Sequence, residues 1–237
     1  MIKLVTWNVN HRARQRRIPT TMAAAIGSLE PDVVILTEYV PGSSREAFLI
    51  ELANQGLAHH ECTEFVKGQN SVLIASKTTL KLGKIRAPAI APAFPSNVLH
   101  VEIPTHEFEV LGVRIPDFSR EPAIRRACWD WIQETADPML KRPIVILGDF
   151  NTSPTYPMAR CGNRINELVA SGWQLASPSN GMSYWTPKGQ GVQIDHAFLS
   201  PRLTTISSRY VVENSGHVFA GKGNNALSDH AALEVTL

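Results

Sequence analysis

The chain has 237 residues, with 23 Lys and Arg against 21 Asp and Glu, a formal net charge of +2 and 43% hydrophobic residues. This composition fits one domain over residues 1–237 with a sizeable core, and the mild positive charge permits a polyanionic substrate without requiring one. Three widely spaced cysteines, with no Cys-x-x-Cys pair, indicate neither a disulfide framework nor a zinc ribbon.

The N-terminus leads directly into a strand pattern and lacks the long apolar segment of a signal peptide. No stretch approaches the ~18 apolar residues of a membrane helix. We therefore expect a soluble, unexported protein of the reducing cytoplasm with no membrane span, and we favour a monomer.

Residues 3–7 alternate in polarity and predict a first strand, which ends at Asn8 and Asn10. The segment 11–17 follows with four arginines, Arg12 among them. A charge run of this kind is usually a solvated loop, while its place directly after Asn8 leaves phosphate steering as the other interpretation.

A helix is predicted between Pro19 and Pro31, where apolar residues recur at helical spacing. The run 32–36 then predicts a buried strand that stops at an acid, Glu38. In the next helix, Ser43 and Glu46 have the spacing of a capping box.

Hairpin strands are expected within 61–86, followed by a proline-rich surface connection over 87–97. Two more strands are predicted over 98–103 and 108–113, and the second delivers Arg114. A helix of about four turns, beginning near Pro122, returns the chain to the middle of the molecule.

The run 144–147 is too short for a helix and predicts a strand covered on both faces. We expect Gly148 to let the backbone turn, with Asp149 and Asn151 projecting from one face at a spacing of two. There a carboxylate and an amide could address one phosphate or a metal-bound water. An ordinary turn is the alternative, since Asp, Asn and Gly are common after strands.

Two Asp-His pairs come late in the chain, and both open apolar runs. Asn8, Glu38 and Asp149 thus lie at predicted strand ends, whereas Asp195 and Asp229 lie at strand beginnings. In a mixed sheet, antiparallel neighbours bring the beginning of one strand to the rim where its partner ends. All five side chains could therefore meet on one rim, where a Mg²⁺ or Mn²⁺ ion would offset their mutual repulsion.

Five segments, taken in order, resemble the motifs of the endonuclease/exonuclease/phosphatase superfamily and span nearly the whole chain. They are Thr6-Trp-Asn-Val-Asn10, Pro31-Asp-Val-Val-Ile-Leu-Thr-Glu38, Gly148-Asp-Phe-Asn151, Gln193-Ile-Asp-His196 and Ser228-Asp-His230. The resemblance implies an α/β fold, a four-layer α/β/β/α sandwich of two mixed sheets flanked by helices. It also implies a Mg²⁺-dependent phosphoesterase site at one rim.

By this resemblance, Glu38 is the principal metal ligand, Asn8 supports the metal or a phosphate oxygen, and Asp229 completes the metal site. His230 matches the catalytic histidine, and Asp195 matches the acid that orients it.

The same resemblance implies that Asp149 orients or deprotonates the attacking water, or protonates the leaving oxygen. Asn151 would donate to a phosphate oxygen. His196 should point away from Asp195 and pack behind the site.

Arg114 departs from the resemblance, since many relatives carry a tyrosine or histidine there. Its guanidinium could clamp a phosphate but cannot act as an acid, and a salt bridge to a rim carboxylate is the alternative. Asn70 matches a frequently polar position of the family. Trp185, like its neighbour Tyr184, is either a core or rim aromatic or a ring that stacks on a base or sugar.

The opening motif and its arginine-containing loop look most like the abasic-site endonuclease and exonuclease branch, which implies phosphate contacts from Asn8, Asn10 and Arg12. The favoured function is a Mg²⁺- or Mn²⁺-dependent nuclease. The alternative is a phosphatase or phosphodiesterase of a small metabolite or lipid headgroup, because one fold serves both. A binding protein with a dead site is disfavoured, since it has no need for a costly cluster of acids.

Overall fold

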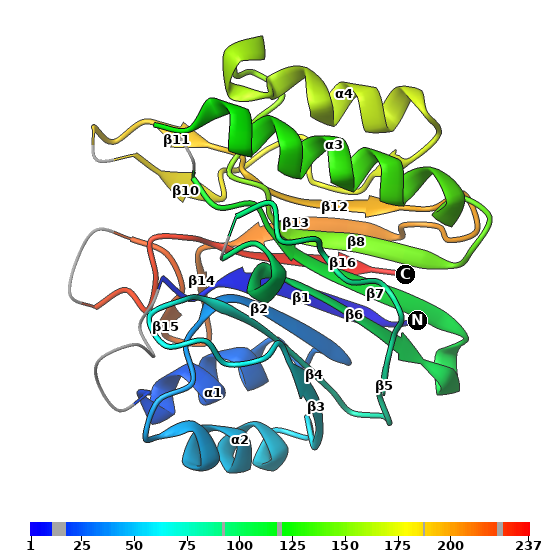
Figure 1. The fold of residues 1–237 in the computed structure, drawn as a ribbon. Coiled ribbons are helices and arrows are strands. Elements are labelled where there is room, and N and C mark those ends of the chain that lie inside the picture. The colour runs from blue at the N-terminus through cyan, green and yellow to red at the C-terminus, as the bar shows by residue number, and fades with distance from the viewer. Residues whose placement is uncertain (11–17, 92, 118–119, 187, 222–224) are drawn as a thin grey trace.

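The structure is a computed structural model that describes residues 1–10, 18–91, 93–117, 120–186, 188–221 and 225–237. Its helices and sheets form four layers, helix, sheet, sheet and helix (Figure 1). This confirms the predicted sandwich of two mixed sheets. The segment with the four arginines, Arg12 included, lies outside the described residues.

The first sheet has the strand order β13-β16-β1-β2-β4-β3. β1 and β2 are parallel, and β16 and β4 flank them in antiparallel orientation. Its strands are β1 (Lys3–Asn8), β2 (Val33–Tyr39), β3 (His59–Cys62), β4 (Ser71–Ser76), β13 (Ser207–Val211) and β16 (Ala232–Thr236).

The second sheet has the order β5-β6-β7-β8-β12-β9. β7 and β8 are parallel, and β12 lies antiparallel to β8. Its strands are β5 (Lys81–Leu82), β6 (Val98–Ile103), β7 (Phe108–Arg114), β8 (Ile144–Asp149), β9 (Gln174–Leu175) and β12 (Asp195–Leu199).

Two further sheets in the described residues have two short strands each. One pairs β10 (Tyr184–Trp185) with β11 (Gly191–Val192), and the other pairs β14 (Glu213–Asn214) with β15 (His217–Val218). Four α-helices lie in the described residues: α1 (Thr20–Ser28), α2 (Arg45–Asn54), α3 (Pro122–Met139) and α4 (Gly162–Ala170). The 3₁₀ turns are η1 (Pro95–Asn97), η2 (Pro104–His106) and η3 (Met158–Arg160).

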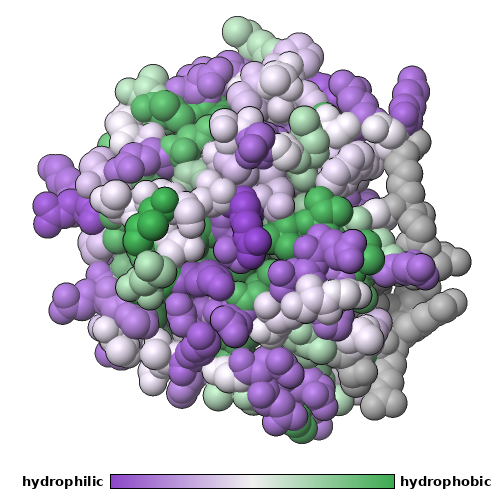
Figure 2. Space-filling model, turned by 180° about the vertical axis from the view of Figure 1, so that it is seen from behind, coloured by the Kyte–Doolittle hydropathy of each residue, from purple (hydrophilic) through white to green (hydrophobic). Residues whose placement is uncertain are grey.

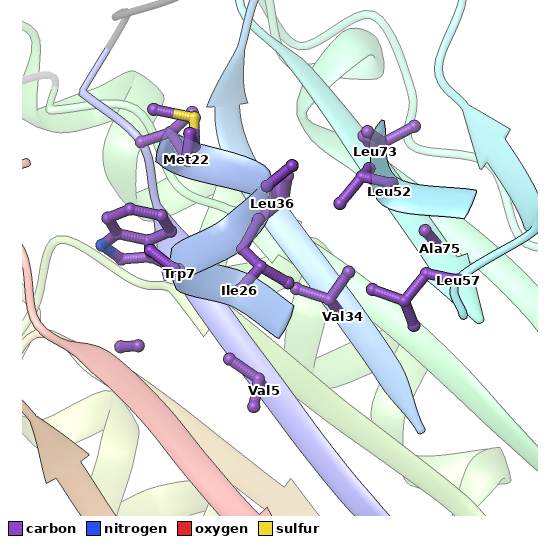
Figure 3. Packing of buried hydrophobic residues seen from close by; sticks show 14 of the residues in the cluster. Val5, Trp7, Met22, Ile26, Val34, Leu36, Leu52, Leu57, Leu73 and Ala75 are labelled. Carbon is purple, nitrogen blue, oxygen red and sulfur yellow. The ribbon is translucent and has the colours of Figure 1, made fainter. Parts of the chain in front are cut away.

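Helices α1 and α2 cover the outer face of the first sheet, and α3 and α4 cover that of the second (Figure 1). Successive residues of the central strands therefore enter different layers of core. Val34 of β2 packs under α1 and α2, where Figure 3 shows it beside Ile26, whereas Ile35 packs between the sheets. Alternating burial on both faces explains why these strands are apolar without interruption.

Three expectations need correction. β8 continues through Gly148 to Asp149, so the glycine lies inside the strand and not in a turn after it. A Cβ at this position would lie 1.9 Å from Val113 O, which shows that the glycine serves close approach of β7 and β8. Helix α2 has Ser44, not Ser43, at its N-cap, without a side-chain capping bond in the described part of the chain; Ser44 Oγ instead accepts a hydrogen bond from Ile18 N at 2.7 Å.

The third correction concerns the hairpin strands expected within 61–86. β3 and β4 do form an antiparallel pair in the first sheet, but β5 belongs to the edge of the second sheet, paired with β6. The chain therefore crosses from one sheet to the other between Ser76 and Lys81.

The surface behind the view of Figure 1 is mostly hydrophilic, with hydrophobic areas between the polar side chains (Figure 2). Within the described ranges, no helix is long and apolar enough to cross a membrane. The two ends of the chain lie side by side, where Ile2 N donates to Leu237 O at 3.0 Å, at the edge opposite to the rim described next (Figure 1).

Candidate active site

One rim of the sandwich collects the polar strand ends. β1, β2, β7 and β8 all end there, while β12 begins there because it runs antiparallel to β8. Asp195 consequently pairs directly with Asp149 in the sheet register. The antiparallel arrangement inferred from the sequence thus brings strand beginnings and strand ends to one edge.

Three polar contacts at this rim each join one sheet to the other. Asn8 Nδ2, at the end of β1, donates to Asp149 Oδ2 of β8 at 2.8 Å. His230 Nδ1, just before β16, bonds Asp195 Oδ2 of β12 at 2.8 Å.

The third contact is an ion pair. Arg114 of β7 donates from Nε and Nη2 to Glu38 Oε1 of β2 at 2.9 and 2.5 Å. The three contacts fix the two sheets relative to each other at the point where the acids converge.

Both the backbone and the ring of His230 are held by neighbouring residues. Its backbone N–H donates to Ser228 Oγ at 3.1 Å, and its carbonyl accepts from Trp7 Nε1 at 2.9 Å. The Tyr184 ring lies 4.8 Å from the imidazole, centroid to centroid. Because Asp195 accepts from Nδ1–H, the Nε2 atom is left for chemistry.

Burial disfavours the charged form of His230, but the charge of Asp195 and the hydrogen bond to it outweigh burial. Asp149 and Asp229 add to this effect, and together they raise the pKa of His230 to about 9. His230 is therefore an imidazolium at neutral pH in the protein without a bound ion.

Asp149 is buried, with 1% of its surface exposed, and is anchored by hydrogen bonds. Its Oδ2 accepts from Asn8 and from Asn151 Nδ2 at 2.8 and 3.0 Å, and its Oδ1 accepts from Asn151 N at 2.8 Å. Burial, together with the charge of Asp195, raises the pKa of Asp149 to about 7, against the opposing charges of His230 and Arg114. A carboxyl with this pKa can take up or release a proton near neutrality.

Asn151 uses both hydrogens of its amide inside the protein. Nδ2 donates to Ile115 O at 2.8 Å as well as to Asp149. A phosphate oxygen could receive a hydrogen bond only after one of these bonds is broken. In this structure, Asn151 positions Asp149.

Three site residues have left-handed backbones although none is glycine: Asn10 at φ 50°, Glu38 at φ 54° and Asn151 at φ 48°. For Glu38 this conformation costs roughly 1–2 kcal/mol. The register of β2 against β4 shifts between Leu36 and Tyr39, so Glu38 lies on a bulge. The bulge directs the carboxylate toward Arg114.

A pocket of about 380 Å³ opens over the rim. Of the predicted site residues, it is lined by Asn10, Glu38, Arg114, Asp149, Asn151, Asp229 and His230. Asn8 and Asp195 lie behind the lining and contact it through Asp149 and His230.

Two predicted substrate contacts lie elsewhere. Trp185 is half-buried and is not among the described lining residues, although Tyr184 and Thr186 on either side of it are. Successive residues of a strand point to opposite faces, which explains the difference. Asn70 is buried at the start of β4 and is also not part of the described pocket wall.

The pocket also contains residues that sequence reasoning missed, namely Asp117, Tyr156, Arg160, Thr186 and Ile194. Most come from loops, whose course depends on tertiary contacts and not on periodicity. His196 is buried behind the pocket: its Nε2 donates to Thr152 O at 2.9 Å, and its Nδ1 accepts from Ser177 Oγ at 3.1 Å.

The donor set fits a hard divalent cation. Glu38, Asp149 and Asp229 present carboxylates to one pocket, and carboxylate oxygens are the ligands that Mg²⁺ and Mn²⁺ prefer. The tightest cluster of possible ligand atoms in the described chain is a different one, Asp149, Asp195 and His230 within 4.8 Å of one another. Since Asp195 and His230 are hydrogen-bonded to each other, we interpret this cluster as an Asp-His pair next to Asp149 and not as the cation site.

Two packed sheets carry an acid and histidine cluster at one rim. A sequence model of the Endonuclease/Exonuclease/phosphatase family matches residues 5–230, so the chain belongs to this family. No protein with curated annotation matches the sequence.

Solved structures share the fold at low identity. An AP endonuclease from Archaeoglobus fulgidus superposes with a TM-score of 0.74 at 17% identity, covering 100% of this chain and 99% of the other. The 3' phosphatase NExo from Neisseria, bound to a product DNA hairpin, gives 0.69 at 18% identity with coverage of 100% and 99%. Truncated TDP2 from Caenorhabditis elegans gives 0.68 at 13% identity, with coverage of 99% and 96%.

Proposed function

We propose that the protein is a divalent-metal-dependent phosphodiesterase that hydrolyses DNA or RNA by in-line attack of water. The observation that carries this proposal is the convergence of Asp149, Asp195 and His230, with ligand atoms within 4.8 Å, on a pocket lined by further acids and arginines. Family membership supports phosphoester hydrolysis, and similar folds belong to proteins named for action on DNA.

In the proposed mechanism, Asp149 orients the attacking water and accepts its proton. Its buried carboxylate, held by Asn8 and Asn151, stays in one orientation. His230, held by Asp195 through Nδ1, stabilises the negative charge that develops on the phosphoryl oxygens. The water oxygen bonds to phosphorus as the P–O bond to the leaving group breaks, and the leaving oxygen takes up a proton from solvent.

Glu38 and Asp229, with Asn8 behind them, are the residues that we propose hold Mg²⁺ or Mn²⁺. A bound ion would neutralise phosphate charge as a Lewis acid. Arg114 forms the salt bridge to Glu38 that was one of its two expected roles. We propose that it balances the Glu38 charge until substrate arrives, and then shares its guanidinium with a phosphate oxygen.

The test is hydrolysis of plasmid DNA, an abasic-site duplex, a single-stranded oligonucleotide and bis(p-nitrophenyl) phosphate, each with Mg²⁺, Mn²⁺ or EDTA. Wild type is compared with Glu38→Ala and His230→Ala, and Arg202→Ala, an exposed arginine outside the pocket wall, is the control. We expect metal-dependent cleavage of nucleic acid that both site variants lose and the control keeps. Full activity in His230→Ala would refute the mechanism.

A phosphatase or phosphodiesterase for a small molecule is the second candidate, because a pocket of about 380 Å³ is within the size range of small-ligand sites. A panel of nucleotides, inositol phosphates and sphingomyelin-type lipids separates the two. Turnover of nucleic acid alone would remove this candidate.

We also propose that the protein works as a monomer in the cytoplasm. The three cysteines, Cys62, Cys128 and Cys161, are all free thiols in the structure, which supports a reducing compartment. Sedimentation of the purified protein tests the monomer.

A further inference from the structure

Arg160 lines the same pocket as the catalytic acids but is not part of the network that joins them. We propose that Arg160, seated on the ring of Tyr156, binds a second phosphate of the substrate, next to the phosphate that is hydrolysed. The ligand is a flanking phosphodiester of a nucleic acid chain. This inference rests on the function proposed above and specifies its substrate as one that carries more than one phosphate.

The charges of the pocket wall single out this residue. The wall has four carboxylates and two arginines. Arg114 is paired with Glu38, and Asp117 is paired with the buried Arg125. Within the described residues, the Arg160 side chain has no carboxylate partner, and it is the arginine of the wall whose hydrogen bonds remain to be made.

The Tyr156 ring holds the guanidinium in a useful way. Arg160 Cζ lies 3.8 Å from the ring centroid, so the ring occupies one face of the planar group. The N–H groups point outward in the plane of the guanidinium and are not consumed by this contact. They remain available to fork onto two oxygens of a phosphate.

The loop that carries the pair is fixed at both ends. At its start, Thr152 O accepts from His196 Nε2 at 2.9 Å, and Tyr156 N donates to Ser153 O at 2.9 Å. At its end, Arg160 lies in η3, and Gly162 approaches so closely that a Cβ would lie 1.9 Å from Tyr156 O. The backbone that carries the pair is therefore held before a ligand binds, and the exposed Arg160 side chain is placed by its contact with the Tyr156 ring, which lowers the entropic cost of binding.

The pocket has room for more than one phosphate. Its volume of about 380 Å³ suits a ligand of several groups, and the described wall extends from His230 and Asp149 to Arg160. An anion near four carboxylates is repelled, so a cation in the same pocket wall would offset this repulsion for a polyanionic chain.

The test is binding of a fluorescein-labelled single-stranded oligonucleotide, measured by anisotropy with Mg²⁺ in a His230→Ala background, as a function of salt. Adding Arg160→Ala should weaken binding about tenfold and reduce the slope of log K against log salt by ~0.7, the loss of one phosphate contact on a single strand. Tyr156→Ala should have a similar effect, while Tyr156→Phe should not. Arg202→Ala is the matched control and should leave affinity and slope unchanged.

The second measurement uses protein that retains His230. The ratio of kcat/KM for the oligonucleotide to kcat/KM for bis(p-nitrophenyl) phosphate should fall about tenfold in Arg160→Ala. If Arg160→Ala binds the oligonucleotide as tightly as its parent, this inference is wrong. It is also wrong if kcat/KM falls equally for both substrates, so that their ratio does not change. Neither result would contradict the proposed hydrolysis. If wild type hydrolyses neither substrate, the proposed function fails, and the salt-dependent binding still decides the role of Arg160.

Discussion

At the scale of single residues, the site depends on partners that motifs do not reveal. The resemblance matched Asp195 to the partner of His230, and the structure has that contact at 2.8 Å. It did not indicate that Asn151 Nδ2 donates both of its hydrogens within the protein, one to Ile115 O and one to Asp149. Nor could a propensity argument place Glu38 in a left-handed conformation, because tertiary contacts and not residue type impose it.

The Asp195 carboxylate should be required for rate more than for substrate binding. In Asp195→Asn we expect kcat to fall by about 10²- to 10⁴-fold, because the amide neither fixes the Nδ1–H tautomer of His230 nor stabilises its charge. Steady-state kinetics on an oligonucleotide measure the change. Asp130→Asn, at an exposed site on α3, is the control, and a variant with near wild-type kcat would contradict the assigned role.

Stability should depend on His196 in mild acid. Burial lowers the pKa of His196 below its usual 6.5, so the unfolded chain binds a proton there before the folded chain does. The free energy of unfolding should therefore fall as pH drops below 6.5, by up to about 1.4 kcal/mol per pH unit from this group.

Urea unfolding at pH 7.5 and 5.5 measures this dependence. His196→Gln removes the titrating group and should lose less stability over that interval than wild type. His59→Gln, at an exposed position on β3, should behave like wild type. Equal losses in His196→Gln and wild type would contradict the assignment.

At the scale of elements, apolar runs and prolines predicted most of the strands and helices that carry the site. β2, β6, β7 and β8 and the helix that begins at Pro122 lie where periodicity placed them. The two-residue strands such as β5 and β9 could not be predicted, because so short a pairing is decided by the neighbouring strand. The sequence did not indicate that Tyr156 and Arg160 line the pocket, because the shape of their loop comes from contacts with β12 and α4.

The parallel pair of β7 and β8 should tolerate no side chain at Gly148. Gly148→Ala would place a Cβ 1.9 Å from Val113 O at a φ of 146°, so we expect a loss of about 3 kcal/mol or more. Arg114 and Asp149, paired in the register of these strands, would be displaced together, so activity should fall as well.

Chemical denaturation and turnover measure the two effects. Ala197→Gly on the adjacent strand β12 is the matched control, and we expect it to cost about 1 kcal/mol. A Gly148→Ala variant as stable as this control would show that β7 and β8 can separate at little cost.

At the scale of the whole molecule, the two sheets share one core. Leu147 of β8 is fully buried between them, together with Ile35 and Val145. The layers could be predicted once the family resemblance was seen, but not which side chains of one sheet oppose those of the other. The facing pairs of side chains depend on the angle and offset at which the two twisted sheets pack.

A shared core predicts a single cooperative unfolding transition. Leu147→Ala should lower the free energy of unfolding by about 2–5 kcal/mol, whereas Ile206→Ala, 61% exposed, should change it by less than about 0.5 kcal/mol. Far-UV circular dichroism and tryptophan fluorescence should report coincident transitions in both variants. Two separate transitions would mean that residues 1–237 form more than one domain.

The three contacts that join the sheets at the rim have a consequence for biosynthesis. Each pair takes one member from each sheet, and the pairs draw on chain positions from Asn8 to His230. A nascent chain on the ribosome cannot assemble the proposed catalytic group until residue 230 has emerged and both sheets have closed. A ribosome-bound intermediate would therefore lack the proposed phosphoesterase activity, which would arise only when folding is complete.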